Sequence, residues 1–231
     1  MLKIITPIFV CCLISGQVID NYTDDREQMV VSQIKQRGVS DQKVLEALLL
    51  VPRHNFVPDD LLPYAYDDYP LPIGYDQTIS QPYIVAYMTE LLQVDTNHIV
   101  LEIGTGSGYQ AAVLAHLSRH VYTIEIVPEL GQRAANLLKE LAYDNITVRI
   151  GDGYLGWPEV APFDRIIVTA APEEIPPELL KQLKPGGRMI LPVGPQWWAQ
   201  ELLIVSKDKA GNVRQQNTIP VRFVPMIHGR D

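Results

Sequence analysis

The sequence predicts an α/β fold in which helices cover both faces of a mostly parallel sheet. From residue 98 to residue 193, short apolar segments alternate with amphipathic segments of helical period. A glycine-rich turn joins one apolar segment directly to a helical one, and two strand-like segments near the end of the chain flank a hairpin-like turn. Alternating strands and helices indicate parallel crossovers, and the final hairpin adds an antiparallel edge.

The first eighty residues are expected to form two helices and a long connection. A helix over residues 24–37 ends at Gly38, and Ser40 is typical of the N-cap of a second helix that ends at Leu50. Residues 52–82 contain six prolines, four tyrosines and little periodicity, so we expect a long functional loop there.

The alternating region follows in a regular order. Strands are expected at residues 98–103, 121–126, 147–150, 165–169 and 188–193, and helices at residues 82–92, 109–117, 128–142 and 176–183. Residues 184–187, Lys-Pro-Gly-Gly, predict a turn. The last two strands are expected at residues 201–206 and 218–224, joined by a turn at residues 210–212.

Composition and charge narrow the class of protein. The chain has 231 residues, of which 47% are hydrophobic and 20% are charged, as is typical of a globular domain with a sizeable core. The formal net charge of −8 argues against a large phosphate-binding surface, so we expect no nucleic-acid partner. No apolar run reaches 18 residues, so we expect no stable membrane association. The adjacent Cys11 and Cys12 and the scattered histidines predict neither a disulfide nor a metal site.

Residues 100–108, Val-Leu-Glu-Ile-Gly-Thr-Gly-Ser-Gly, are the most informative segment. A strand that leads through a tight glycine turn into a helix presents backbone N–H groups to a ligand. Gly104, Gly106 and Gly108 form G-x-G-x-G, one residue shorter than the dinucleotide fingerprint G-x-G-x-x-G. The shorter spacing is the pattern associated with S-adenosylmethionine-dependent methyltransferases, whose cofactor has no pyrophosphate.

Acidic residues stand at the ends of successive predicted strands, where ligands of open α/β sheets bind. Glu102 precedes the glycine loop, and Glu125, 21 residues after Gly104, can accept hydrogen bonds from both hydroxyls of a ribose. Asp152-Gly153 ends the third strand and can hold an adenine edge. Each acid alone is also compatible with a solvated position, and Gly-Asp-Gly with a plain turn. Their occurrence on successive strand ends favours a nucleoside site.

Ser80 has two interpretations. It precedes Gln81-Pro82, so its hydroxyl suits an N-cap of the following helix. It also suits a hydrogen bond to a methyl acceptor, and a capping hydroxyl retains that ability.

The chain resembles the protein-L-isoaspartate O-methyltransferase family, which repairs damaged aspartyl and asparaginyl residues. The matching segments are residues 77–82 (Gln-Thr-Ile-Ser-Gln-Pro), 100–111, 151–153, 162–164 with 166–171, 183–194, and 221–225 (Val-Arg-Phe-Val-Pro). The resemblance covers approximately residues 24–228. The first and last of these segments are specific to this family, whereas the glycine loop is shared by many methyltransferases.

The resemblance implies a Rossmann-like class I methyltransferase with a seven-stranded sheet, S-adenosylmethionine as methyl donor and isoaspartyl peptides and proteins as substrates. It places Ser80 at the position of the family's active-site serine. The predicted catalytic residue is therefore Ser80, and the predicted cofactor-binding residues are Thr78, Ile79, Glu102, Gly104, Thr105, Gly106, Ser107, Glu125, Asp152 and Gly153. The acceptor would be a free α-carboxylate, which is ionised at neutral pH and needs no general base.

Three alternatives remain at this point. A methyltransferase for another small-molecule or macromolecular acceptor would share the glycine loop without requiring Thr78-Ile79-Ser80. A nicotinamide-dependent oxidoreductase would require G-x-G-x-x-G, and a nucleoside-binding module would need no catalytic group.

Residues 1–20 form an apolar extension that precedes the single predicted domain, residues 21–231. Lys3, the apolar residues 4–14 and the small Ser15-Gly16 resemble a weak secretory signal. Export would separate the enzyme from its cofactor, so we expect a cytoplasmic protein, with export as the alternative. Nothing in the sequence demands more than a monomer.

Overall fold

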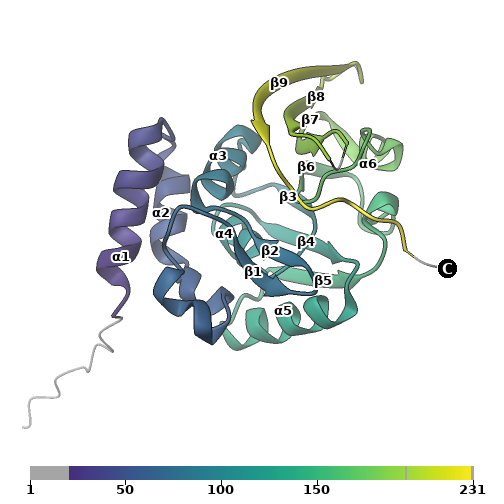
Figure 1. The fold of residues 1–231 in the computed structure, drawn as a ribbon. Coiled ribbons are helices and arrows are strands. Elements are labelled where there is room, and N and C mark those ends of the chain that lie inside the picture. The colour runs from purple at the N-terminus through teal and green to yellow at the C-terminus, as the bar shows by residue number, and fades with distance from the viewer. Residues whose placement is uncertain (1–20, 196, 230–231) are drawn as a thin grey trace, which may run out of the picture.

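A computed structural model describes residues 21–195 and 197–229. It contains a seven-stranded sheet in the order β5-β4-β3-β6-β7-β8-β9 and a separate two-stranded hairpin, β1-β2 (Figure 1). The large sheet comprises β3 (Ile99–Ile103), β4 (His120–Glu125), β5 (Ile146–Ile150), β6 (Phe163–Val168), β7 (Leu183–Val193), β8 (Gln200–Lys207) and β9 (Val213–Val221). The helices between its strands are α4 (Tyr109–Ala115), α5 (Pro128–Glu140) and α6 (Pro177–Gln182), and α3 (Pro82–Leu92) precedes β3.

The strand pairing confirms the predicted fold class. Strands β3 to β7 pair in parallel, whereas β8 is antiparallel to both β7 and β9. Val100 belongs to a core cluster that includes residues of α2 (Gln42–Leu50), α3 and α4, whereas Leu101 belongs to a cluster that includes Leu179 of α6. Successive residues of a strand point to opposite faces, so both faces of the sheet are buried beneath helices.

The N-terminal helix is present but is not α-helical throughout. It consists of α1 (Thr23–Gln28), a π-helical segment η1 (Met29–Ile34) and a 3₁₀ segment η2 (Lys35–Arg37), and it ends at Gly38 with φ +100°.

The predicted N-cap of the second helix, Ser40, is wrong. Helix α2 (Gln42–Leu50) is capped by Asp41, whose carboxylate accepts hydrogen bonds from the N–H groups of Lys43 and Val44. The backbone N–H of Ser40 donates instead to the carboxylate of Glu90 on α3, at 2.6 Å. This contact with a distant helix displaces the cap by one residue.

The predicted long loop contains more regular structure than expected. Residues 52–82 include the 3₁₀ helices η3 (Arg53–Phe56) and η4 (Asp59–Tyr64) and the hairpin of β1 (Leu71–Gly74) and β2 (Gln77–Ile79). Tyr75 and Asp76 turn this hairpin with φ of +54° and +56°. Glycine and asparagine normally signal such a turn, so a Tyr-Asp turn escapes a sequence pattern.

Two C-terminal boundaries also differ from the prediction. The predicted turn at residues 184–187 lies within β7, where four residues stand opposite the single residue between Phe163 and Arg165 of β6. The final strand, β9, starts before the predicted residue 218, because the carboxylate of Asp208 accepts hydrogen bonds from the N–H groups of Ala210 and Asn212 and closes a tighter turn.

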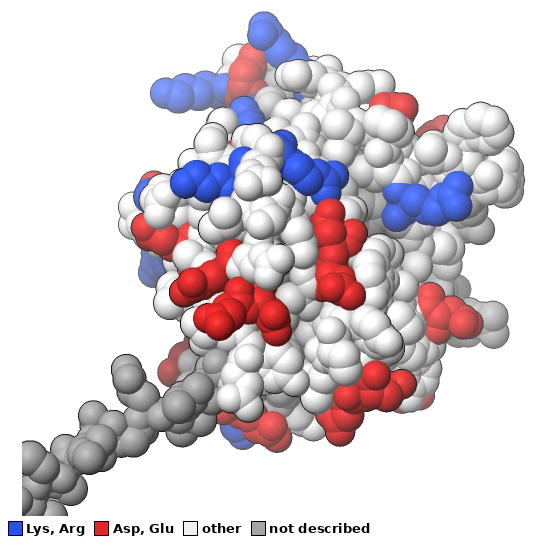
Figure 2. All heavy atoms as spheres, turned by 60° about the vertical axis from the view of Figure 1, so that its left-hand side comes forward, with Lys and Arg blue, Asp and Glu red and all other residues white. Residues whose placement is uncertain are grey.

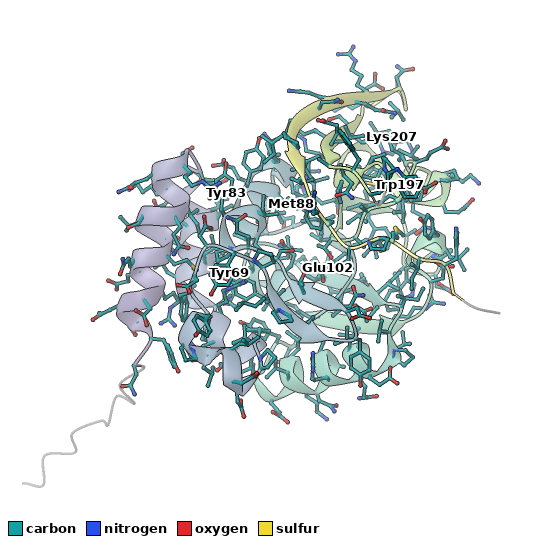
Figure 3. The ribbon with its side chains drawn as sticks, viewed as in Figure 1. Tyr69, Tyr83, Met88, Glu102, Trp197 and Lys207 are labelled. Carbon is teal, nitrogen blue, oxygen red and sulfur yellow. The ribbon has the colours of Figure 1, made fainter. Side chains whose placement is uncertain are left out.

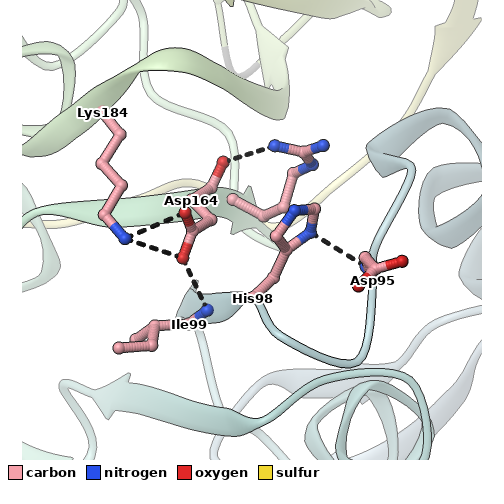
Figure 4. Close-up of polar contacts among 6 residues, drawn as sticks. Asp95, His98, Ile99, Asp164 and Lys184 are labelled. Carbon is pink, nitrogen blue, oxygen red and sulfur yellow. Dashed lines mark hydrogen bonds and ion pairs between the residues drawn. The ribbon is translucent and has the colours of Figure 1, made fainter.

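A polar cluster joins β3 and β6 at the sheet edge where both strands begin (Figure 4). One carboxylate oxygen of Asp164 accepts a hydrogen bond of 2.8 Å from the N–H of Ile99, and both oxygens lie 2.9 Å from the ammonium of Lys184. Partial burial raises the pKa of Asp164, but these donors outweigh burial and lower the pKa overall. The ionised carboxylate therefore stabilises the folded state.

Replacing Asp164 by asparagine should lower the free energy of unfolding at pH 7 by about 1–2 kcal/mol, because charge-assisted hydrogen bonds are lost. The folded-state pKa is depressed, so this stability exists above the pKa of the unfolded state and disappears as pH falls through the folded-state pKa. Denaturant unfolding at pH 7 and near pH 3.5, close to the ordinary pKa of Asp, measures the difference. Asp144→Asn, an exposed matched change, should have no effect; an equal loss for Asp164→Asn at both pH values would contradict the assignment.

Candidate active site

The glycine loop between β3 and α4 is held against the end of β6. Gly104 has φ +94°, and a Cβ atom there would lie 2.5 Å from the hydroxyl oxygen of Thr169. That hydroxyl lies 3.0 Å from the carbonyl oxygen of Ile103 and 2.8 Å from that of Gly104, and is the donor to both. A side chain at residue 104 is therefore excluded by both backbone conformation and space.

The loop is also tied to the end of β4. One carboxylate oxygen of Glu125 accepts the N–H of Gly106 at 2.7 Å, and the other accepts the N–H of Val127 at 3.0 Å. Each carboxylate oxygen has a second lone pair that can accept a ligand hydroxyl. Glu125 is buried yet lines a cavity together with Gly104 and Gly106, as a ribose-binding carboxylate must.

Three other predicted cofactor-binding residues, from the end of β3 and from the loop, lie behind the surface of this cavity. The hydroxyl of buried Thr105 forms a hydrogen bond of 2.7 Å with that of Thr123, and the hydroxyl of Ser107 accepts the N–H of Tyr109. Glu102 is completely buried and lines neither of the cavities described below (Figure 3). Burial raises the pKa of Glu102 to about 8, so its carboxyl is mainly neutral at pH 7. These side chains pack on the buried side of the loop and support its conformation.

The end of β5 meets the C-terminal segment of the chain. Asp152 caps the short helix η5 (Gly153–Leu155) through the N–H of Tyr154, and its second oxygen accepts the N–H of Gly229 at 3.0 Å. Gly153 lines the same cavity as Glu125, and a side chain there would overlap Ile103. The predicted pair thus divides its roles: Gly153 faces the cavity and Asp152 holds the surrounding chain.

Two adjoining cavities lie at the carboxyl edge of the sheet. The inner cavity, about 100 Å³, is lined by Glu125, the glycine loop and Gly153. The outer cavity, about 700 Å³, is lined by Ser80 among other residues. Thr78, Thr169 and Val224 line both, so the two cavities share a wall of three residues. Ile79 lies between Thr78 and Ser80 with its side chain in the hydrophobic core.

Ser80 does not cap α3. That helix begins at Pro82, its N-cap residue is Gln81, and no side chain caps it. The capping interpretation of Ser80 is therefore wrong, whereas its place in the outer cavity agrees with the second interpretation.

A buried arginine that sequence reasoning missed fixes the backbone at Ser80. Arg53 is fully buried; its guanidinium donates to the carbonyl oxygens of Ala65 and Ser80, each at 2.8 Å. It also lies 4.9 Å from the ring centre of Tyr109, the first residue after the glycine loop. Burial lowers the pKa of Arg53 to about 10, so it is a cation at neutral pH. A single arginine in a proline-rich segment carries no sequence signal of such a role.

The C-terminal segment completes both cavities. The N–H of Ala171 donates to the carbonyl of Val224, and the N–H of Met226 donates to the carbonyl of Ala171. This pairing holds residues 224–226 against the end of β6, where they line the inner cavity. The segment formed part of the resemblance, but no local pattern in the sequence placed it at the cavities.

Comparisons with known proteins identify the family of this chain. Residues 24–231 match the family model described as Protein-L-isoaspartate(D-aspartate) O-methyltransferase (PCMT). The chain belongs to this family. A protein-L-isoaspartate O-methyltransferase of Polaromonas sp. is 58% identical over 190 residues, covering 82% of this chain and 90% of the relative. The corresponding protein of Opitutus terrae is 56% identical over 203 residues, covering 88% and 87% of the two chains.

Solved structures of the family share the fold. One protein-L-isoaspartate O-methyltransferase is 32% identical with a TM-score of 0.79, over 87% of this chain and 65% of the longer solved chain. A putative member from Plasmodium falciparum, solved in complex with S-adenosyl-L-homocysteine, is 25% identical with a TM-score of 0.76, over 87% of this chain and 98% of its own. Family members use S-adenosylmethionine, and the carboxylate of Glu125 beside Gly104 and Gly106 fits its nucleoside.

Glu125→Gln should weaken binding of S-adenosylhomocysteine about tenfold, because an amide accepts ribose hydroxyls less strongly than a carboxylate. Isothermal titration calorimetry measures the dissociation constant. The matched control is Glu129→Gln, an exposed residue in the first turn of α5, which should bind as the unmodified protein does. An unchanged affinity in Glu125→Gln would remove this carboxylate from the cofactor site.

Proposed function

We propose that this chain transfers a methyl group from S-adenosylmethionine to the free α-carboxylate of L-isoaspartyl residues in damaged proteins. The observation that carries the proposal is the shared wall of the two cavities, Thr78, Thr169 and Val224. It joins the inner cavity, which we propose for the nucleoside, to the outer cavity that contains Ser80. Membership of the family supports both the cofactor and the acceptor.

The chemistry needs orientation more than proton transfer. When bound, S-adenosylmethionine supplies an electrophilic methyl group on a sulfonium sulfur. That methyl group would accept a bond from a carboxylate oxygen of the acceptor, with the sulfur as leaving group keeping the electron pair of the broken C–S bond. An acceptor carboxylate with an ordinary pKa near ~4 is already ionised at pH 7, so no general base is required. Alignment of the two reactants alone contributes roughly 7–11 kcal/mol.

The described residues divide this work in our proposal. Ser80 donates a hydrogen bond to the acceptor carboxylate, while Arg53 holds the backbone of Ser80 in place. Glu125 accepts the ribose hydroxyls, and the glycine loop admits the cofactor against the main chain. The amide nitrogen of the following residue then attacks the ester carbonyl and displaces methanol to form a succinimide, which water reopens partly to normal aspartate, and so repair begins.

We also propose that residues 21–231 act as a monomeric, single-domain enzyme in the cytoplasm, with export through residues 1–20 as the alternative. That leader lies outside the described residues. Among the described residues, no helix is both long and apolar enough to span a bilayer. On the face drawn in Figure 2, basic side chains lie mostly above the acidic ones and form no continuous basic surface, which supports the absence of a nucleic-acid partner.

The test is transfer of a radiolabelled methyl group from S-adenosylmethionine to a synthetic isoaspartyl peptide, with the aspartyl peptide of the same sequence as control. We expect label in the isoaspartyl peptide alone, as a base-labile ester. Equal label in both peptides, or none in either, would refute the proposed acceptor.

Ser80→Ala should reduce kcat for the isoaspartyl peptide by about 10²-fold, the effect that a misalignment of about 1 Å between reacting groups can produce. Calorimetry should show unchanged affinity for S-adenosylhomocysteine. Ser32→Ala, at an exposed serine of η1, is the control for the substitution itself. Turnover of Ser80→Ala equal to that of the control would exclude the proposed hydrogen bond.

A further inference from the structure

Two adjacent tryptophans stand in solvent on the connection between β7 and β8. Trp197 is 80% exposed and Trp198 is 72% exposed, the two highest values among the large hydrophobic side chains of the described residues (Figure 3). Large aromatic side chains are usually buried, and exposed aromatic clusters mark surfaces that bind a partner. The proposed chemistry at Ser80 and Glu125 does not use this pair.

The residues that follow the tryptophans contact the wall of the outer cavity. Trp198 is followed directly by Ala199, which lines that cavity together with Ser80. The side chain of buried Gln200 accepts the N–H of Phe223 at 2.9 Å and donates to the carbonyl of Pro195 at 3.4 Å. Gln200 thus joins both ends of the tryptophan connection to the C-terminal segment that forms the cavity wall.

Part of the lining of the outer cavity is apolar, like the two tryptophans. Ile84, Pro220 and Phe223 contribute to its lining, beside the polar Thr78 and Ser80. A chain bound with its reacting carboxylate at Ser80 therefore lies in a cavity whose lining includes apolar side chains and Ala199, the neighbour of Trp198 in sequence.

We propose that Trp197 and Trp198 bind apolar or aromatic side chains of the substrate polypeptide that lie close in sequence to the isoaspartyl residue. The inference rests on the proposed function and deepens it by naming a substrate class. Folded proteins bury such side chains, whereas damaged and partly unfolded segments expose them. The pair thereby favours damaged sites in unfolded segments over those on intact surfaces.

The experiment compares kcat and KM for three acceptors. One isoaspartyl peptide carries leucine and phenylalanine at flanking positions, a second carries serine and glycine there, and the third is an isolated N-acetyl isoaspartyl amide. In Trp197→Ala/Trp198→Ala, KM for the apolar peptide should rise about tenfold or more, while kcat changes less than about twofold. KM for the other two acceptors should stay the same. Tyr64→Ala, which removes an exposed ring outside the cavity lining, should behave like the unmodified protein.

Fluorescence gives a direct binding measurement. In Trp157→Phe the pair provides the tryptophan emission of this chain, since its three tryptophans are Trp157, Trp197 and Trp198. Saturating apolar peptide should shift that emission to shorter wavelength, and the serine-glycine peptide should not. A shift with phosphatidylcholine vesicles and none with the apolar peptide would overturn the proposal in favour of a lipid surface.

The outcomes separate the two proposals. If the unmodified protein methylates none of the isoaspartyl acceptors, the proposed function fails. If it methylates them and the double variant loses activity equally on all three, or on none, the tryptophan proposal alone fails. Unchanged affinity of the double variant for S-adenosylhomocysteine shows that the cofactor site is intact and makes either result interpretable.

Discussion

The candidate site depends on the close approach of the glycine loop to the end of β6. Thr169 donates to the carbonyl oxygens of Ile103 and Gly104, and its hydroxyl occupies the space that a side chain at residue 104 would need. Gly106 in turn donates its N–H to Glu125 at the end of β4. Three neighbouring strands therefore converge on one loop, and a side chain at Gly104 would disturb all of these contacts together.

The cavities proposed for the methyl donor and for the acceptor have different origins. The inner cavity is built largely from strand ends of the parallel sheet, as expected for an open α/β fold. The outer cavity is built from the end of the β1-β2 hairpin, the start of α3 and the segment after β9. Arg53 links the two sides, because it binds the carbonyl of Ser80 and lies over the ring of Tyr109.

Local patterns predicted the donor side well. The spacing of Gly104, Gly106 and Gly108 located the loop, and strand counting placed Glu125 beside it, because both signals depend on residues near in sequence. The same local patterns predicted Ser40 as the N-cap of α2, although its backbone N–H binds Glu90 of α3 and Asp41 caps the helix. They also predicted Glu102 as a cofactor-binding residue, although its side chain is buried away from both cavities.

By itself the sequence determined the fold class, the methyl donor and the family. The glycine spacing, the strand–helix alternation and the motif at residues 77–82 each involve residues that are close in sequence, and each pattern supports the same family separately. The tertiary structure alone decided which of these residues face the cavities and what holds them there. Arg53 meets Ser80 across 27 residues of chain, and Val224 meets Ala171 across more than 50. Such contacts arise from packing of the whole chain, and no spacing in the sequence encodes them.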